Sequence, residues 1–135
     1  MFDTFTLLDL DITTAVSATA LAGNNSLYAM QGLAIEANFT YGSGGTTAKA
    51  YVQTSLDGGS NWIDVACLAF TTASARKVVN LNGKTAVASF TPADGALADN
   101  TEKDGVLGDR LRVKYVTTGT YGGDTNLKVS VTPKP

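Results

Sequence analysis

The chain has 135 residues, of which 44% are apolar and 16% are charged, and it carries a net charge of −2 without any histidine. The charged fraction lies below the usual quarter, so residues 1–135 are expected to fold, and their length suits a single domain. The negative balance argues against nucleic acid as the main partner, and the lack of histidine removes the commonest general base and metal ligand.

The N-terminal segment is predicted to hold one or two strands between residues 2 and 19. It has acids where a signal peptide needs basic residues, and no stretch of the chain approaches the roughly 20 apolar residues of a membrane helix, so we expect neither a signal nor a membrane span. Residues 1–12 are interpreted either as an ordinary edge strand or as an arm that pairs with a neighbouring copy. The apolar side chains of such an arm are Phe2, Phe5, Leu7, Leu8 and Leu10.

Alternating apolar and polar residues predict two strands in the next part of the chain. Between residues 27 and 41 the odd positions are mostly apolar, which indicates one buried face and one wet face. The glycines of residues 42–45 predict a hairpin turn. The returning strand is expected over residues 46–55, again with apolar residues along one face.

Two further turns organise the middle of the chain. A tight turn at residues 57–59 leads into a strand expected over residues 61–70. Residues 76–81 and 85–90 are predicted to pair with each other through Asn-Gly at 82–83, which is a strong hairpin signal.

The C-terminal third joins a long loop to two strands. Residues 92–109 lack periodicity, contain three glycines and carry five acids against one lysine, so they are predicted to form a long acidic loop. Alternation predicts strands over 110–115 and 127–132, and Pro133 and Pro135 are expected to end the pairing.

Together these segments give about eight short strands, which predicts an all-β fold, either an antiparallel two-sheet β-sandwich or a jelly roll. Charge is unevenly placed: residues 1–36 carry four acids and no base, residues 92–109 have a net charge of −4, and residues 110–135 have +4. These blocks are either solvated faces of different strands or complementary ends that meet between neighbouring copies.

No constellation in the sequence points to catalysis. Cys67 is the single cysteine and lies in an apolar strand, so it is interpreted as a core residue. Residues 83–85, Gly-Lys-Thr, resemble the end of a phosphate loop, but Val78 stands where that motif needs a glycine. The acids of residues 92–109 do not follow the spacing of a calcium loop. We therefore expect a protein that is not an enzyme and that holds no metal or cofactor.

The most specific local pattern is Ser-Leu-Asp-Gly-Gly-Ser-Asn-Trp over residues 55–62, which matches the Asp-box pattern S-x-D-x-G-x-x-W of many β proteins. In the families that carry it, this box is structural. Its Asp is expected to accept hydrogen bonds from backbone N–H groups, its glycine to take the left-handed conformation and its Trp to pack the turn against the core. The residues of this structural turn are Ser55, Asp57, Gly59 and Trp62.

Several segments resemble small virion proteins of tailed bacteriophages and gene transfer agents. The recurring pattern in those proteins is a strand ending in Gln-Thr-Ser, an Asp-Gly-Gly turn, a Trp-x-Asp-Val strand and an Arg-x-Arg-x-x-Tyr strand, followed by a Gly-containing turn and a last alternating strand. In this chain the first four parts are residues 53–55, 57–59, 62–65 and 110–115.

The resemblance implies a structural virion protein, most of all a capsid decoration (cement) or minor capsid protein. Its implied partner is the major capsid protein, with assembly as a homo-oligomer such as a trimer, and its implied place is the capsid surface after synthesis in the host cytoplasm. Two alternatives stay open, a neck or tail-completion protein and a carbohydrate-binding sandwich for host attachment. The rings available for stacking on a sugar are Tyr28, Tyr41, Tyr51, Trp62 and Tyr121.

Overall fold

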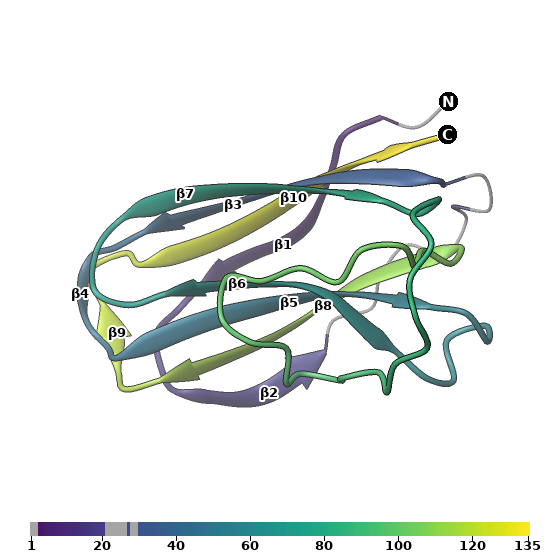
Figure 1. Ribbon diagram of the computed structural model, residues 1–135. Helices are drawn as coiled ribbons and strands as arrows, with labels where there is room; N and C mark the ends of the chain where they lie inside the picture. Colours follow the sequence, from purple (N-terminus) through teal and green to yellow (C-terminus); the bar gives the residue numbers. More distant parts are fainter. Residues whose placement is uncertain (1–2, 21–26, 28–29) are drawn as a thin grey trace.

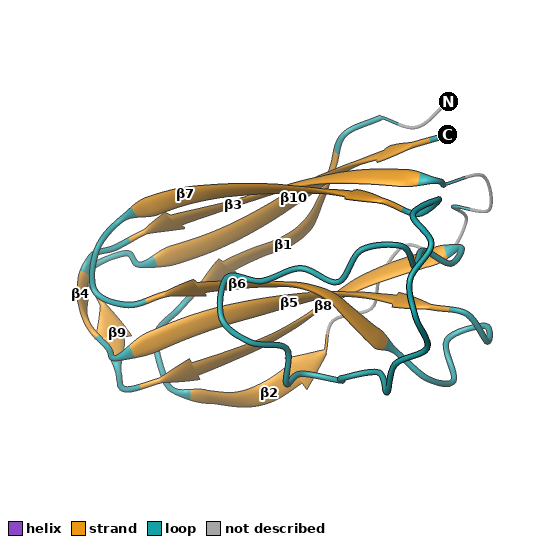
Figure 2. Ribbon diagram, in the orientation of Figure 1, coloured by secondary structure: helices purple, strands orange, loops and turns teal. Residues whose placement is uncertain are grey.

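The computed structural model describes residues 3–20, 27 and 30–135, and over these residues it is all-β (Figure 1, Figure 2). Eight longer strands form the framework, and two residue pairs form a small extra ladder. The described residues include no helix that is long and apolar enough to cross a membrane. The strands are β1 (Phe5–Asp11), β2 (Val16–Ala20), β3 (Gly32–Thr40), β4 (Ser43–Gly44), β5 (Thr47–Ser55), β6 (Ile63–Phe70), β7 (Ala75–Asn82), β8 (Arg110–Thr118), β9 (Tyr121–Gly122) and β10 (Asn126–Lys134).

The eight longer strands form two four-stranded antiparallel sheets that face each other (Figure 1). The first sheet has the order β1-β10-β3-β7, and the second has the order β2-β8-β5-β6. The strands pair as nested hairpins, β1 with β10, β2 with β8, β3 with β7 and β5 with β6. Folding this nested hairpin over itself adds the pairs β10–β3 and β8–β5 and gives the jelly roll. The predicted fold class is confirmed.

The core lies between the two sheets, where inward-facing side chains of both layers meet. Along β3 the odd-numbered residues from Leu33 to Phe39 are buried, as the alternation predicts. Phe39 stacks on Phe70 with 5.1 Å between ring centroids, and the edge of Tyr121 meets it at 5.7 Å. Because Phe39 comes from the first sheet and Phe70 from the second, this aromatic cluster joins the two layers.

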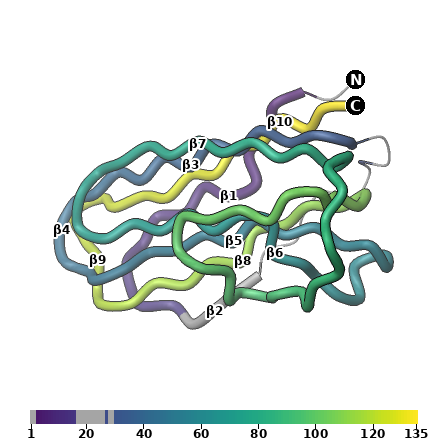
Figure 3. Tube along the Cα trace, viewed as in Figure 1, coloured from purple at the N-terminus to yellow at the C-terminus, as the bar shows by residue number. Residues whose placement is uncertain are grey.

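The hairpin predicted at residues 42–45 is wrong. β3 and β5 lie in different sheets, so the chain crosses from one layer to the other at this point (Figure 3). The short strand β4 instead pairs with β9, which lies in the matching crossover between β8 and β10. A glycine-rich turn signals a change of direction, but it does not determine which strand becomes the neighbour.

The hairpin predicted through residues 82–83 is also wrong. β7 pairs with β3, and residues 85–90 form no strand. The backbone N–H of Asn82 donates to the Asp104 carboxylate in the following loop instead of to a partner strand. The loop between β7 and β8 therefore begins at Gly83, earlier than the predicted start of the acidic loop.

Pairing continues past Pro133, whereas the sequence predicted that it would stop there. β10 extends to Lys134 and stays in register with β3. The carbonyl of Thr125 accepts from Ile12 on the β1 side, and backbone direction alternates along a strand, so Pro133 also faces that side. Registered pairing with β1 ends at Val131, so the missing N–H of proline removes no ladder bond.

We expect Phe39→Ala to destabilise the fold strongly. Phe39 is fully buried between the sheets, so its truncation leaves a cavity next to Phe70 and Tyr121. The expected loss is about 3–5 kcal/mol of unfolding free energy, measured by urea denaturation. The control is Val87→Ala. Val87 is 41% exposed, so this substitution should change the unfolding free energy by less than about 0.5 kcal/mol. Equal losses in the two variants would contradict the assigned core.

Candidate functional site

The outer face of the second sheet is covered along β5, and this cover defines the candidate site. A face open to water would leave alternate residues exposed, but every residue from Ala50 to Ser55 is buried. The cover is the loop that contains residues 92–109, which runs in front of the second sheet in Figure 2. The buried polar residues of β5 and β6 are Gln53, Thr54, Ser55 and Asp64.

Three polar residues stand side by side across the second sheet, and we call Asp64, Gln53 and Arg112 the polar row. Strand register places Asp64 beside Gln53, and Gln53 beside Arg112. Gln53 Nε2 donates to Asp64 Oδ1 at 2.7 Å, and Gln53 Oε1 accepts from Arg112 Nε at 2.6 Å. The amide is therefore bonded at both ends, as its complete burial requires.

Asp64 fixes the backbone of the loop where it meets the sheet. Its Oδ1 accepts from the N–H of Gly95 at 2.9 Å, and its Oδ2 accepts from those of Ala96 at 2.9 Å and Leu97 at 3.0 Å. The backbone N–H of Asp64 donates to the carbonyl of Ala93 at 2.8 Å. Hydrogen bonds from successive backbone N–H groups compensate a buried carboxylate, so one side chain of β6 shapes this part of the loop.

Asp94 extends the polar row toward solvent. It accepts from Gln53 Nε2 at 2.7 Å and from Lys114 Nζ at 3.0 Å, and Arg112 Nη2 lies 3.8 Å away. Burial raises the pKa of the Asp94 carboxyl, but hydrogen bonds from Gln53 and Lys114 outweigh it and hold this pKa below its usual value. Burial lowers the pKa of the Arg112 guanidinium, and the nearby carboxylates oppose that shift. Arginine keeps its charge in proteins, so Asp94 and Arg112 form an ion pair at neutral pH.

The same loop covers one of the two outer edges of the second sheet. β6 is the last strand of that sheet, so one side of its backbone has no neighbouring strand. The N–H of Cys67 donates to the carbonyl of Thr101 at 2.9 Å, and the N–H of Lys103 donates to that of Val65 at 2.8 Å. Covering an edge with a loop prevents pairing with another chain, so association through β6 is blocked.

The Asp-box residues form a self-braced turn between β5 and β6. Ser55 Oγ donates to Asp57 Oδ1 at 2.9 Å. Asp57 Oδ1 also accepts from the N–H of Asn61 at 2.8 Å. The side-chain hydrogen bond from Asn61, followed by backbone and Ser55 bonds, lowers the pKa of the Asp57 carboxyl. Gly59 has a φ of 93°, a region that glycine accepts without strain. The turn is thus held by its own side chains.

Trp62 connects this turn to the polar row. Its Nε1 donates to the carbonyl of Gly59 at 3.1 Å, and the guanidinium carbon of Arg112 lies 4.3 Å from the indole centroid. The ring therefore packs over Arg112 on the outer face of the sheet, whereas the sequence pattern placed it against the core. Arg112 is enclosed by the indole, by Gln53 and by Asp94.

The apolar residues of the N-terminal segment lie within the first sheet. β1 is an edge strand that pairs with β10. Leu8 is buried in the core, and Phe5, Leu7 and Leu10 pack against it as partly buried side chains. Phe2 lies outside the described residues. From Phe5 onward these side chains pack within the fold. This placement is that of an edge strand rather than of an extended arm.

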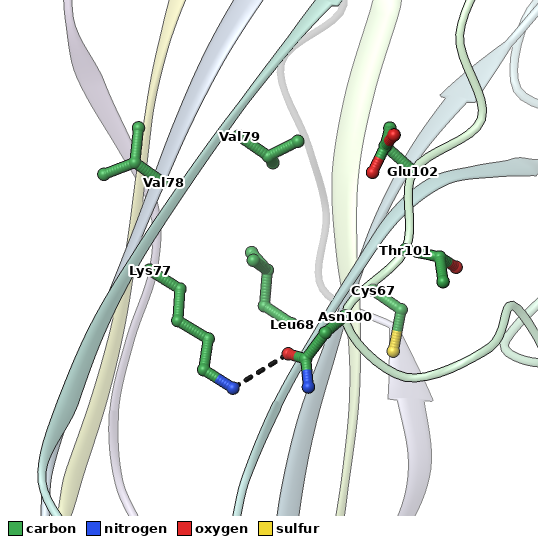
Figure 4. A pocket seen from close by; sticks show the side chains of 8 residues that line it. All are labelled: Cys67, Leu68, Lys77, Val78, Val79, Asn100, Thr101 and Glu102. Carbon is green, nitrogen blue, oxygen red and sulfur yellow. Dashed lines mark hydrogen bonds between the residues drawn. The ribbon is translucent and has the colours of Figure 1, made fainter.

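The hollows beside the loop include two of similar volume. One has a volume of about 480 Å³ and is lined at the Asp-box end by Trp62, Asp57 and Asp94, among others. The other has a volume of about 430 Å³ and lies between β6, β7 and the loop, where Lys77 Nζ donates to Asn100 Oδ1 at 2.8 Å (Figure 4). Within the described part of the chain, no group of three or more His, Cys, Asp or Glu side chains is placed to hold a metal ion.

The aromatic rings considered for sugar binding differ in how far they are buried. Tyr51 and Tyr121 are buried, and Tyr121 Oη donates to the carbonyl of Thr71. Tyr41 is half-buried, and Tyr28 lies outside the described residues. Trp62 lines the hollow at the Asp-box end.

The titratable side chains at this site are buried or engaged in hydrogen bonds. Cys67 is free and buried, and burial raises the pKa of its thiol, so it stays protonated at neutral pH. The carboxylates of the site are bonded to backbone N–H groups, to the Gln53 amide or to cations. No protein-family model matches the chain, and no curated protein matches it.

The polar row was not predicted from the sequence. Alternation placed Gln53 on the strand face opposite the apolar one, and nothing local showed that a distant loop covers that face. The available signal was the spacing itself: a Gln follows an apolar residue pair and an Asp interrupts an apolar strand on the two sides of one tight turn. Register through such a turn brings Gln53 and Asp64 into adjacent positions.

We expect Asp64→Asn to destabilise the protein, because it replaces one acceptor oxygen by an N–H₂ group that faces backbone N–H donors. A buried donor left without its acceptor costs about 1–3 kcal/mol, measured as unfolding free energy in urea. Asp99→Asn makes the same chemical change within the loop that Asp64 anchors. The Asp99 side chain is 54% exposed and pairs with Lys49 at 2.8 Å, so this control should cost less than about 1 kcal/mol. A loss at Asp99 as large as that at Asp64 would contradict the anchoring role.

Proposed function

We propose that the protein is a non-enzymatic structural virion protein, a capsid decoration or minor capsid protein that binds the major capsid protein lattice. The observation that carries this proposal is that the three strand parts of the virion-protein pattern meet at one place. Gln53, Asp64 and Arg112, each from a different part, form the polar row. Trp62, from the same part as Asp64, packs over Arg112.

The convergence makes the pattern more specific than a set of strands and turns. Separate strand signals would be satisfied by any β-sandwich, but these residues bond to one another and through Asp64 to the loop. A rigid scaffold that holds a long loop in place is suited to recognition. Jelly rolls recur in viral capsid and lectin domains, which supports the proposal by analogy of fold alone.

The loop offers an acidic surface for a partner. It carries five acids against one lysine between residues 92 and 109, and the side chains of Asp99 and Asp109 are about half exposed. A basic or polar patch on the partner would complement this surface and select the docking orientation. On a capsid lattice many equivalent weak contacts act together, so no single contact has to be strong.

Particles purified from cells that carry the gene test the proposal. The expected result is hundreds of copies of this chain per particle by quantitative mass spectrometry, with jelly-roll density on the outside of the capsid lattice in electron microscopy. About a dozen copies located at the neck or tail would favour the neck or tail-completion alternative. Particles without the chain would overturn the virion assignment.

A second candidate function is carbohydrate binding for host attachment, and the hollow at Trp62 favours it. An indole beside carboxylate groups offers a stacking surface next to hydrogen-bond acceptors, which is the chemistry a sugar needs. Asp57 contributes acceptor oxygens at the rim, and its lowered pKa keeps it charged.

A glycan array tests this second function directly. The unaltered protein should bind at least one glycan, Trp62→Ala should lose that binding, and Trp62→Phe should keep part of it because a ring remains. Circular dichroism verifies that both variants are folded. The absence of any bound glycan for the unaltered protein would remove this candidate.

A further inference from the structure

The first sheet has two outer strands, β1 and β7, and each has a neighbouring strand on one side only. Unpaired strand edges are templates for pairing with another chain. The corresponding edge of the second sheet at β6 is covered by the loop, as described above. β7 has no bulge against β3 over eight consecutive register pairs, so its outer edge is regular.

The backbone groups of β7 that face away from the sheet can be identified from the hydrogen bond that follows its last residue. The N–H of Gly83 donates to the carbonyl of Gln31 on the β3 side, and backbone direction alternates along a strand. Arg76, Val78 and Asn80 therefore direct their N–H and C=O groups away from the sheet. Among the described residues, none supplies a backbone partner to these groups.

The outward backbone groups of β1 follow in the same way. The N–H of Ile12 donates to the carbonyl of Thr125 on the β10 side, so Asp9 and Asp11 face away from the sheet. A register shift between Thr6 and Leu8 interrupts the first half of β1, which leaves its second half as the regular part of the edge.

The two edges carry opposite charge. β7 has Arg76 and Lys77 near its start and no acid, and β1 has Asp9 and Asp11 near its end and no base. The Arg76 side chain is 67% exposed, and Val78 is exposed to 66%, the largest exposure of any large apolar residue described. Cross-strand pairs of opposite charge stabilise a sheet, whereas like charges destabilise it.

Strand direction makes the two edges compatible. Neighbouring strands alternate in direction along the order β1-β10-β3-β7, so β1 of a second copy placed beside β7 continues the antiparallel pattern. Antiparallel pairing then brings the end of β1 against the start of β7. Within one copy, register already places Asp9, Lys128, Asn38 and Arg76 in a single row across the sheet. A second copy added in that register continues the row with its own Asp9 next to Arg76.

We infer that the chain self-associates head to tail, with the outer edge of β7 pairing with the outer edge of β1 of a second copy through backbone hydrogen bonds and an Arg76–Asp9 ion pair. Contacts of this kind use two different surfaces, so they close into a ring when the rotation between copies allows it. Arg76 already pairs with Glu36 at 3.0 Å and Asp9 accepts from Asn126, but these groups are exposed and their bonds are readily exchanged. This self-association does not depend on the proposed virion role.

Charge exchange between the two strands tests the pairing. Sedimentation velocity over a wide concentration range should show self-association of the unaltered chain. Arg76→Glu and Asp9→Arg should each weaken it at least tenfold, and the double variant Asp9→Arg/Arg76→Glu should recover most of the loss because the pair is restored in reverse. The control Lys84→Glu makes the same charge change as Arg76→Glu at an exposed site beyond the end of β7 and should leave association unchanged.

A proline at the outer edge provides an independent test. Val78→Pro removes a backbone N–H that has no partner within the described chain, so the circular dichroism spectrum should be retained while association is lost. A chain that stays monomeric at millimolar concentration would overturn the inference. So would association that tolerates Val78→Pro, or a double charge variant as weak as either single one. An effect of Arg76→Glu without any effect of Asp9→Arg would point to pairing between two β7 strands and would also overturn it.

Discussion

The second sheet and the loop that covers it are held together by one buried amide. Gln53 lies on β5, an inner strand of the second sheet, and bonds to Asp64 on one side and to Arg112 on the other. Its Nε2 also reaches Asp94 in the loop. A buried amide of this kind is stable only when its donors and acceptor are all engaged, so β5, β6, β8 and the loop must be in place together.

The loop makes the jelly roll asymmetric. On the second sheet it buries a face that would otherwise be wet and covers the edge of β6, so these surfaces are closed to other chains. On the first sheet the loop reaches the end of β7, where Asp104 accepts from the N–H of Asn82, but no described segment covers the rest of β7 or β1. The same chain therefore presents an acidic loop on one layer and unpaired strand edges of opposite charge on the other. Binding to a large partner and association between copies can then use different surfaces without competing.

Local periodicity was sufficient to predict the strands but not their partners. The odd-numbered residues of β3 are buried because alternation is a property of a single strand. The turn at Asp57 was also predictable, since β5 and β6 are consecutive and antiparallel. The hairpins expected at residues 42–45 and 82–83 failed because a jelly roll pairs strands that are far apart in sequence, and local turn chemistry carries no information on such pairing. Gln53 and Asp64 were hidden for the same reason, since the loop that buries them arrives from elsewhere in the chain.

Native-state hydrogen exchange of the unaltered protein tests the central claim most directly. If the buried amide and its partners hold the loop as part of the folded unit, the N–H groups of Gly95, Ala96 and Leu97 will exchange as slowly as the sheet amides of β6. Their exchange would then depend on denaturant in the same way as global unfolding. Rapid exchange of these three amides while the sheet stays protected would contradict the account, because the loop would then open without disturbing the fold.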